Sequence, residues 1–141
     1  AKACIVAALE LAEAYGLRLM LEYLYSTRAE IALADDQLDE AEDWVRRSLD
    51  VARERNNAAH VAKCQANLGR IAQRRGDLDT ALLQLEEAAT LASALTARYM
   101  QTQIDLWLGE LYATRGERIA AFEALSRAED RLAGLPESLP E

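Results

Sequence analysis

A repeat of 40 residues constrains the fold of this chain more than any other feature. When the segments 31–48, 71–88 and 111–128 are placed in register, residues of similar size coincide. Small residues coincide in three sets: Ala29, Gly69 and Gly109; Ala41, Ala81 and Ala121; and Ser48, Ala88 and Ala128. Larger apolar residues also coincide in three sets: Leu24, Cys64 and Ile104; Ile31, Ile71 and Leu111; and Val45, Leu85 and Leu125. A fixed period of this length is typical of a protein built from stacked copies of one structural unit.

The composition indicates that this unit is helical. Of the 141 residues, 51% are hydrophobic, and only 6 are Gly and 2 are Pro. Alanine, leucine, glutamate and arginine, which are abundant here, are strong helix formers. Apolar residues such as Val61, Cys64, Leu68 and Ile71 recur at spacings of three and four, which places them on one face of a helix. The sequence therefore predicts an all-α fold.

Helix-breaking residues divide each period in half. One series contains Asp36, Gly76 and Gly116, and the second, midway between them, contains Gly16, Asn56, Thr96 and Pro136. Glycine adopts the left-handed conformation that ends a helix, and Asp77 can cap the helix that follows Gly76. The breaks predict about seven helices, at residues 1–15, 18–34, 38–55, 58–75, 78–95, 98–115 and 118–133. Because the connections are short, neighbouring helices should be antiparallel.

The helices alternate between two types. We call the helix before each of the breaks at Asp36, Gly76 and Gly116 an A helix, and the helix after it a B helix. The first helix matches the B type, so the chain is expected to begin with half a repeat. The predicted domain is a helical array over residues 1–134, with a half repeat at 1–16 and repeats at 17–56, 57–96 and 97–134. Residues 135–141 are predicted to form a linker or tail.

The repeats resemble the tetratricopeptide repeat over nearly the whole chain. The resemblance lies in the pairs Leu68-Gly69 and Leu108-Gly109, each followed by alanines twelve and nineteen residues after the glycine: Ala81, Ala88, Ala121 and Ala128. It implies a right-handed α–α superhelix in which Gly69 and Ala81 lie where helices A and B cross. The period departs from the family's usual length of about 34 residues. The first repeat departs as well, with Arg28-Ala29 in place of Leu-Gly.

The longer period is similar to that of MalT-like, LuxR-type bacterial transcriptional regulators. In those proteins the superhelix senses an inducer or partner, while nucleotide-binding and DNA-binding domains lie elsewhere in the polypeptide. The resemblance implies a non-catalytic, cytoplasmic module that binds a protein, a peptide or a small-molecule inducer. Similar spacing also occurs in eukaryotic scaffold proteins. The alternative is therefore a structural scaffold or oligomerisation module, including a homodimer formed through the open ends of the array.

Charge and residue content argue against several other classes of protein. The net charge of −8 disfavours direct contact with nucleic acid or with an anionic membrane. The single histidine, His60, would have to serve as base for any nucleophile. His60 and Cys64 can face the same way, but a structural zinc site needs four ligands. We therefore expect no catalytic residue, metal or cofactor, and we place His60 and Cys64 in the core or an interface.

One helix face is a candidate binding site. Lys63, Asn67, Arg70 and Arg74 follow one another at helical spacing on the second A helix. By the family resemblance, the A helices line a concave groove. Arginine and asparagine there suit a carboxylate or a peptide backbone, as in family members that clamp a peptide carboxylate. The alternative is an ordinary solvated face. Equivalent positions on the flanking A helices complete the candidate groove: Tyr23, Thr27, Glu30, Gln103, Trp107 and Glu110.

Three residues in or beside that groove allow more than one interpretation. Trp107 precedes the Leu108-Gly109 pair, so its indole should point away from the core stripe and could anchor a ligand. Alternatively, neighbouring repeats cover it. Tyr99 and Met100 follow the Thr96 break and form either a groove edge or part of the core.

Overall fold

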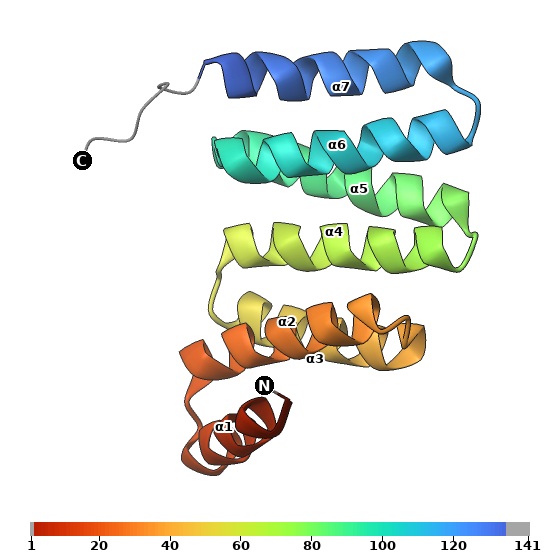
Figure 1. The fold of residues 1–141 in the computed structure, drawn as a ribbon. Helices are drawn as coiled ribbons and strands as arrows, with labels where there is room; N and C mark the ends of the chain where they lie inside the picture. Colours follow the sequence, from red (N-terminus) through yellow and green to blue (C-terminus); the bar gives the residue numbers. More distant parts are fainter. Residues whose placement is uncertain (1, 135–141) are drawn as a thin grey trace.

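Seven helices stack in one direction within residues 2–134, the part of the chain that this computed structural model describes (Figure 1). Their bounds are α1 (Lys2–Tyr15), α2 (Arg18–Ala34), α3 (Leu38–Glu54), α4 (Ala58–Arg74), α5 (Leu78–Ala94), α6 (Arg98–Thr114) and α7 (Arg118–Ala133). Successive helices form antiparallel hairpins that stack from α1 at one end to α7 at the other. The predicted all-α superhelix of about seven antiparallel helices is confirmed.

The helix bounds agree with the predicted ones to within a residue. Arg55, Arg75, Leu95 and Arg115 are the C-cap residues of α3, α4, α5 and α6, where the sequence predicted the last helical residue. Ala1 and the predicted tail at 135–141 lie outside the described residues. The division into one half repeat and three full repeats remains a prediction.

The turns form where the breaker residues occur. Within the described part, the six residues at these breaks have φ angles between 53 and 81°: Gly16, Asp36, Asn56, Gly76, Thr96 and Gly116. At each break, the N–H of the next residue donates to the carbonyl five residues earlier, as Asp77 does to Ala72 at 2.9 Å. This bond is the one that closes a helix around a left-handed residue. Pro136, the last predicted break, lies outside the described residues.

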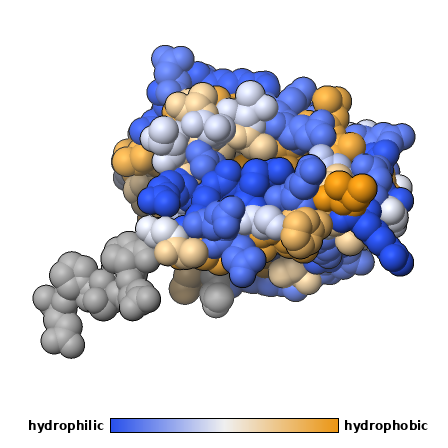
Figure 2. All heavy atoms as spheres, turned by 90° about the horizontal axis from the view of Figure 1, so that it is seen from above, coloured by the Kyte–Doolittle hydropathy of each residue, from blue (hydrophilic) through white to orange (hydrophobic). Residues whose placement is uncertain are grey.

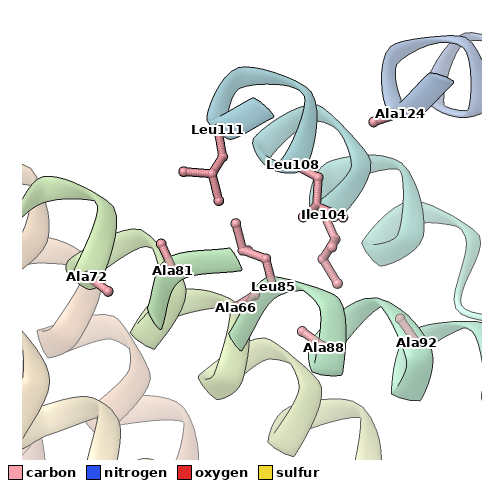
Figure 3. Packing of buried hydrophobic residues seen from close by; sticks show 10 residues of the cluster. All are labelled: Ala66, Ala72, Ala81, Leu85, Ala88, Ala92, Ile104, Leu108, Leu111 and Ala124. Carbon is pink, nitrogen blue, oxygen red and sulfur yellow. The ribbon is translucent and has the colours of Figure 1, made fainter. Parts of the chain in front are cut away.

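Small residues allow helices A and B to approach closely. A Cβ atom added at Gly69 would lie 2.9 Å from Cγ of Leu85 and 3.2 Å from the carbonyl oxygen of Ala81. The predicted crossing of α4 and α5 at Gly69 and Ala81 is therefore confirmed. Figure 3 shows Leu85 of α5 pointing toward Ile104, Leu108 and Leu111 of α6, so the same helix also packs against the next repeat.

One predicted core position is wrong at the end of the array. Val45 and Leu85 are 2% and 0% exposed, but Leu125, which occupies the same register, is 45% exposed. The reason is that α4 covers α3 and α6 covers α5, whereas no helix within residues 2–134 covers the outer face of α7. Figure 2 looks onto this end of the molecule and shows hydrophobic residues scattered among hydrophilic ones.

Candidate ligand-binding groove

A groove of about 610 Å³ lies along the A helices α2, α4 and α6. The stacking of the repeats brings side chains about 40 residues apart in sequence into one wall. The residues that line the groove are Glu30 from α2; Lys63, Ala66, Asn67 and Arg70 from α4; and Tyr99, Met100, Gln103 and Trp107 from α6. The groove thus brings together most of the predicted site residues, around the second A helix.

Arg70 stacks on the indole of Trp107 in this groove. The guanidinium carbon of Arg70 lies 4.6 Å from the centre of the Trp107 ring. Burial, and to a smaller extent the nearby Arg74, lower the pKa of Arg70, but a guanidinium keeps its charge in proteins. No carboxylate within residues 2–134 lies at ion-pair distance from Arg70. Arg70 is therefore a held, partly buried cation that makes no ion pair within residues 2–134, and the carboxylates of Glu30 and Glu110 act on it only from a greater distance.

The other two cations of the stripe have carboxylate partners. Lys63 Nζ lies 2.8 Å from Glu30 Oε1, across α4 and α2. Arg74 Nη1 lies 3.4 Å from Asp36 Oδ1, and Arg74 does not line the groove. The predicted three-cation face is thus reduced to one cation without a partner, because the tertiary structure brings acidic residues of the preceding repeat next to the stripe.

The burial of Asn67 does not fit the alternative in which the stripe is an ordinary solvated face. Its side chain is buried, with 4% of the residue exposed, yet it lines the groove beside Arg70. Helix α4 packs against α3 and α5 and, to a smaller extent, against α6. Asn67 is therefore a buried residue of the groove lining and not part of a solvated face.

Four predicted residues do not line this groove. Tyr23 is exposed, and the hydroxyl of Thr27 donates to the Tyr23 carbonyl at 3.0 Å within α2. Glu110 and Arg74 lie further along their helices, beyond the groove lining. Apart from Glu30, the lining residues all come from α4 and α6. The sequence period alone does not indicate this restriction.

Sequence reasoning left two lining residues undecided and missed a neighbouring hollow. Tyr99 and Met100 both line the groove, and Met100 also packs against the core. Beside them is a mainly apolar hollow of about 380 Å³ that shares Tyr99 and Gln103 with the groove. Its other apolar walls include Leu106 of α6 and Leu132 of α7. Only the packing of α7 on α6 brings these residues together, so no sequence spacing pointed to the hollow.

Cys64 is buried and His60 is partly buried, in agreement with the predicted place in the core or an interface. His60 Nε2 lies 2.8 Å from Ser48 Oγ, and His60 Nδ1 lies 3.6 Å from Glu22 Oε1. A serine, a histidine and an acid in this order resemble a hydrolase triad, but Ser48 is 0% exposed, and a nucleophile must reach its substrate. Burial raises the pKa of Cys64 to about 11, which keeps its thiol protonated.

Residues 2–134 contain no cluster of three or more His, Cys, Asp or Glu side chains able to hold a metal ion. In the same range, no helix combines the length and the apolar character that crossing a membrane requires.

The fold and the groove together define a class: a helical-repeat protein whose A helices line an exposed groove. A family model described as the tetratricopeptide repeat matches residues 20–94, more than half of the chain. The chain therefore belongs to the tetratricopeptide repeat family. Repeats of this family generally mediate contacts between proteins and are generally non-catalytic, so the chain is a protein-interaction or scaffold module.

A solved structure supports the fold. The chain is similar to BtubC (BKLC) from P. vanneervenii, with a TM-score of 0.80 and 21% sequence identity. The similarity covers 97% of this chain and 57% of that one, so the chain spans little more than half the length of its structural relative. No curated protein sequence matches the chain.

Proposed function

We propose that the groove binds an acidic segment of a partner protein, and that Arg70 receives a carboxylate of that segment. The observation that carries this proposal is the stacking of Arg70 on Trp107 without a carboxylate partner in the described residues. A guanidinium offers two parallel N–H donors that match the two oxygens of a carboxylate. Asn67 also lines the groove, and its amide would add a donor and an acceptor for the backbone of an extended peptide.

The arrangement lowers the cost of binding. Stacking on the indole restricts the Arg70 side chain before a ligand arrives, so less conformational entropy is lost on binding. Lys63 contributes less to an acidic ligand, because Glu30 already neutralises it. We therefore assign the main electrostatic role to Arg70, and positioning roles to Asn67 and Trp107.

The wider context in this proposal is a bacterial, cytoplasmic, MalT-like regulator of the LuxR type. The support is the 40-residue period together with the length of the structural relative, which leaves room for further segments. In that context a bound partner or a small-molecule inducer would favour one stacking arrangement of the repeats and pass it to attached domains.

A structural or oligomerisation role is the second candidate. It is favoured by large apolar side chains of α7 that are exposed, namely Ile119, Phe122, Leu125 and Leu132. Light scattering over a range of concentrations distinguishes the two roles: a monomer at every concentration removes self-association.

A peptide titration tests the groove. The probes are an acetylated, amidated tetraglutamate peptide and its tetraglutamine counterpart, followed by tryptophan fluorescence or calorimetry. We expect Arg70→Ala to weaken tetraglutamate binding about tenfold, since a hydrogen-bonded charge pair contributes about 1.5–3 kcal/mol. Arg70→Lys should recover part of the loss.

Arg74→Ala is the matched control, because it removes the same charge from the same helix outside the groove. It should leave the affinity nearly unchanged. Equal affinities for Arg70→Ala and Arg74→Ala, or equal binding of the two peptides, would contradict the proposed site.

A further inference from the structure

Helix α7 lies at one end of the stack and has a face that no other helix within residues 2–134 covers (Figure 1). Along this face runs a narrow stripe of five residues, all exposed and spaced alternately by four and three: Arg118, Phe122, Leu125, Glu129 and Leu132. We call this stripe the α7 seam. Spacings of four and three place residues on one side of a helix, where a second helix can pack along them.

The two B helices inside the array show what a following A helix requires of the same stripe. The corresponding residues are Leu38, Glu42, Val45, Leu49 and Ala52 of α3, and Leu78, Leu82, Leu85, Ala89 and Ala92 of α5. All of them are buried or partly buried, because α4 packs on α3 and α6 packs on α5. All except Glu42 are apolar. A stripe that receives an A helix is therefore almost entirely apolar.

The α7 seam departs from that requirement at three positions. Arg118 occurs where α3 and α5 both have leucine, and Glu129 occurs where they have leucine and alanine. A following A helix would have to bury both charges, which is costly unless each one is paired. Leu132 occupies the position of two alanines that are 0% exposed, so its larger side chain would hold that helix away. The seam is therefore poorly suited to another copy of the repeat.

An ion pair that joins the inner B helices to the next A helix is also missing from α7. Arg75, the C-cap residue of α4, has Nη2 2.6 Å from Oδ1 of Asp39 in α3. Arg115, the C-cap residue of α6, has Nη1 3.2 Å from Oδ1 of Asp79 in α5. The corresponding residue of α7 is Ile119, which is 78% exposed. The arginine of a further repeat would find no carboxylate there.

The α7 seam is complementary to itself in one orientation. If a second α7 runs antiparallel about the midpoint between Phe122 and Leu125, each Phe122 lies opposite Leu125 of the second copy. Each Arg118 then lies opposite Glu129 of the second copy, whereas a parallel arrangement would place like charges opposite each other. Within residues 2–134, neither Arg118 nor Glu129 forms an ion pair. The midpoint acts as a two-fold axis, so every contact occurs twice.

We propose that the α7 seam is the interface of a homodimer in which two copies of the chain pair through antiparallel α7 helices. This proposal rests on the second candidate role, self-association, and gives that role a surface and a partner. It does not depend on ligand binding, because the groove is lined by α2, α4 and α6. One helix face is a small interface, so the dimer is expected to be reversible.

Sedimentation equilibrium of the 141-residue chain tests the dimer. The concentration runs from about 1 µM to about 1 mM, the range of a weak association. A reductant is present, because Cys4 is exposed and could form a disulfide between copies. We expect a monomer–dimer equilibrium. A monomer throughout, the result for a seam that receives a helix of another protein, would overturn the proposal. Assemblies larger than a dimer would overturn it too, since a two-fold contact closes on itself.

Charge reversal tests the antiparallel arrangement. Arg118→Glu and Glu129→Arg should each weaken the dimer about tenfold, since each turns two attractive pairs into two repulsive ones. The double variant Arg118→Glu/Glu129→Arg restores opposite charges and should recover most of the native affinity. Both residues are exposed, so these changes should leave the fold intact. A double variant as weak as the product of the two single losses would refute the pairing.

An aromatic residue at each end of the array supplies a matched pair of variants. Phe122 of α7 is 73% exposed and Tyr15 of α1 is 75% exposed. Phe122→Ala should weaken the dimer at least about tenfold, because large aromatic side chains dominate interfaces of this kind. Tyr15→Ala should leave it unchanged, and equal losses would contradict a specific seam.

The tetraglutamate titration separates the dimer from the groove. Phe122→Ala should keep the peptide affinity of the native protein, because Phe122 does not line the groove. Failure of the dimer therefore appears in sedimentation, and failure of the proposed groove appears in the titration. A loss of dimer and peptide affinity together in Phe122→Ala would contradict the assignment of this residue to a separate interface.

Discussion

At the scale of single residues, the same repeat position can have very different tolerances. Gly69 and Gly109 are 40 residues apart and both lie at an A–B crossing. A Cβ atom at Gly69 meets the backbone oxygen of Ala81 at 3.2 Å and the fully buried Leu85 at 2.9 Å. A Cβ atom at Gly109 meets the half-exposed Leu125 at 2.7 Å but stays 3.6 Å from the Ala121 oxygen. Of these neighbours, only the Leu125 side chain is free to move.

We therefore predict different effects of the same substitution. Alanine gains about 1 kcal/mol of helix propensity over glycine at either site. At Gly69 overpacking costs about 1–3 kcal/mol and outweighs that gain, whereas at Gly109 the Leu125 side chain can rotate away. Gly69→Ala should lower the free energy of unfolding and Gly109→Ala should leave it unchanged or raise it, as measured by urea denaturation. A larger loss for Gly109→Ala would contradict this account.

At the scale of helices, ends are set by pairs of adjacent residues. A left-handed residue closes one helix, and the residue after it can cap the next. Asn57 and Asp77 do this for α4 and α5 by accepting the backbone N–H of the residue three positions on, each at 3.2 Å. Thr80 lowers the pKa of Asp77 through hydrogen bonds from its side chain and backbone. The charged form of Asp77 is thus the one that the folded helix end favours.

The capping role of Asp77 gives a prediction with a pH dependence. Because its folded pKa lies below the ordinary value of 3.8, the stabilisation is complete above that value and fades as the pH falls through the folded pKa. Asp77→Ala should lower the thermal midpoint at about pH 7, and Asp77→Asn should preserve most of it, since both amide and carboxylate oxygens cap helices.

A comparison of the native protein with Asp77→Asn at low pH provides the control. On acidification to about pH 3, below the ordinary range of an aspartate, the advantage of the native protein over Asp77→Asn should shrink. An advantage that stays constant or grows down to that pH would contradict a charge-dependent cap.

At the scale of the whole molecule, the two ends of the array differ. Helix α7 packs on its A partner α6 and buries Ala121, Ala124 and Ala128. Within residues 2–134, helix α1 packs mainly on α2, and only Leu9 and Ala12 are buried along it. In a repeat array each unit is stabilised by its nearest neighbours alone, so the terminal helix that packs less extensively on its neighbour should open first.

Amide exchange under native conditions tests this prediction. Protection in α1 should be at least about tenfold lower than in α7, although both helices are terminal in the described chain. Amides of α4 and α5, which have neighbours on both sides, should be the slowest to exchange. Protection of α1 equal to that of α7 would contradict the nearest-neighbour account.

Much of the architecture could be predicted because it depends on local properties. Left-handed residues at Gly76 and Gly116 and apolar stripes at helical spacing act within a few residues of chain, so helix number, ends and order followed from pattern alone. The groove was predicted in part. Arg70 and Trp107 were both named from their register, but their mutual stacking depends on how α6 packs against α4.

The sequence by itself determined the repeat, the helices, the turns and the helix that carries the candidate site. The tertiary structure decided which charges are neutralised, which polar side chains are buried and which core positions are left uncovered. Lys63 meets Glu30, Arg74 meets Asp36, and Glu22 meets Arg55, over separations of 33 to 38 residues. The physical reason is that ion pairing and burial depend on distances between helices, which the stacking of neighbouring repeats sets and the local pattern of residues does not encode.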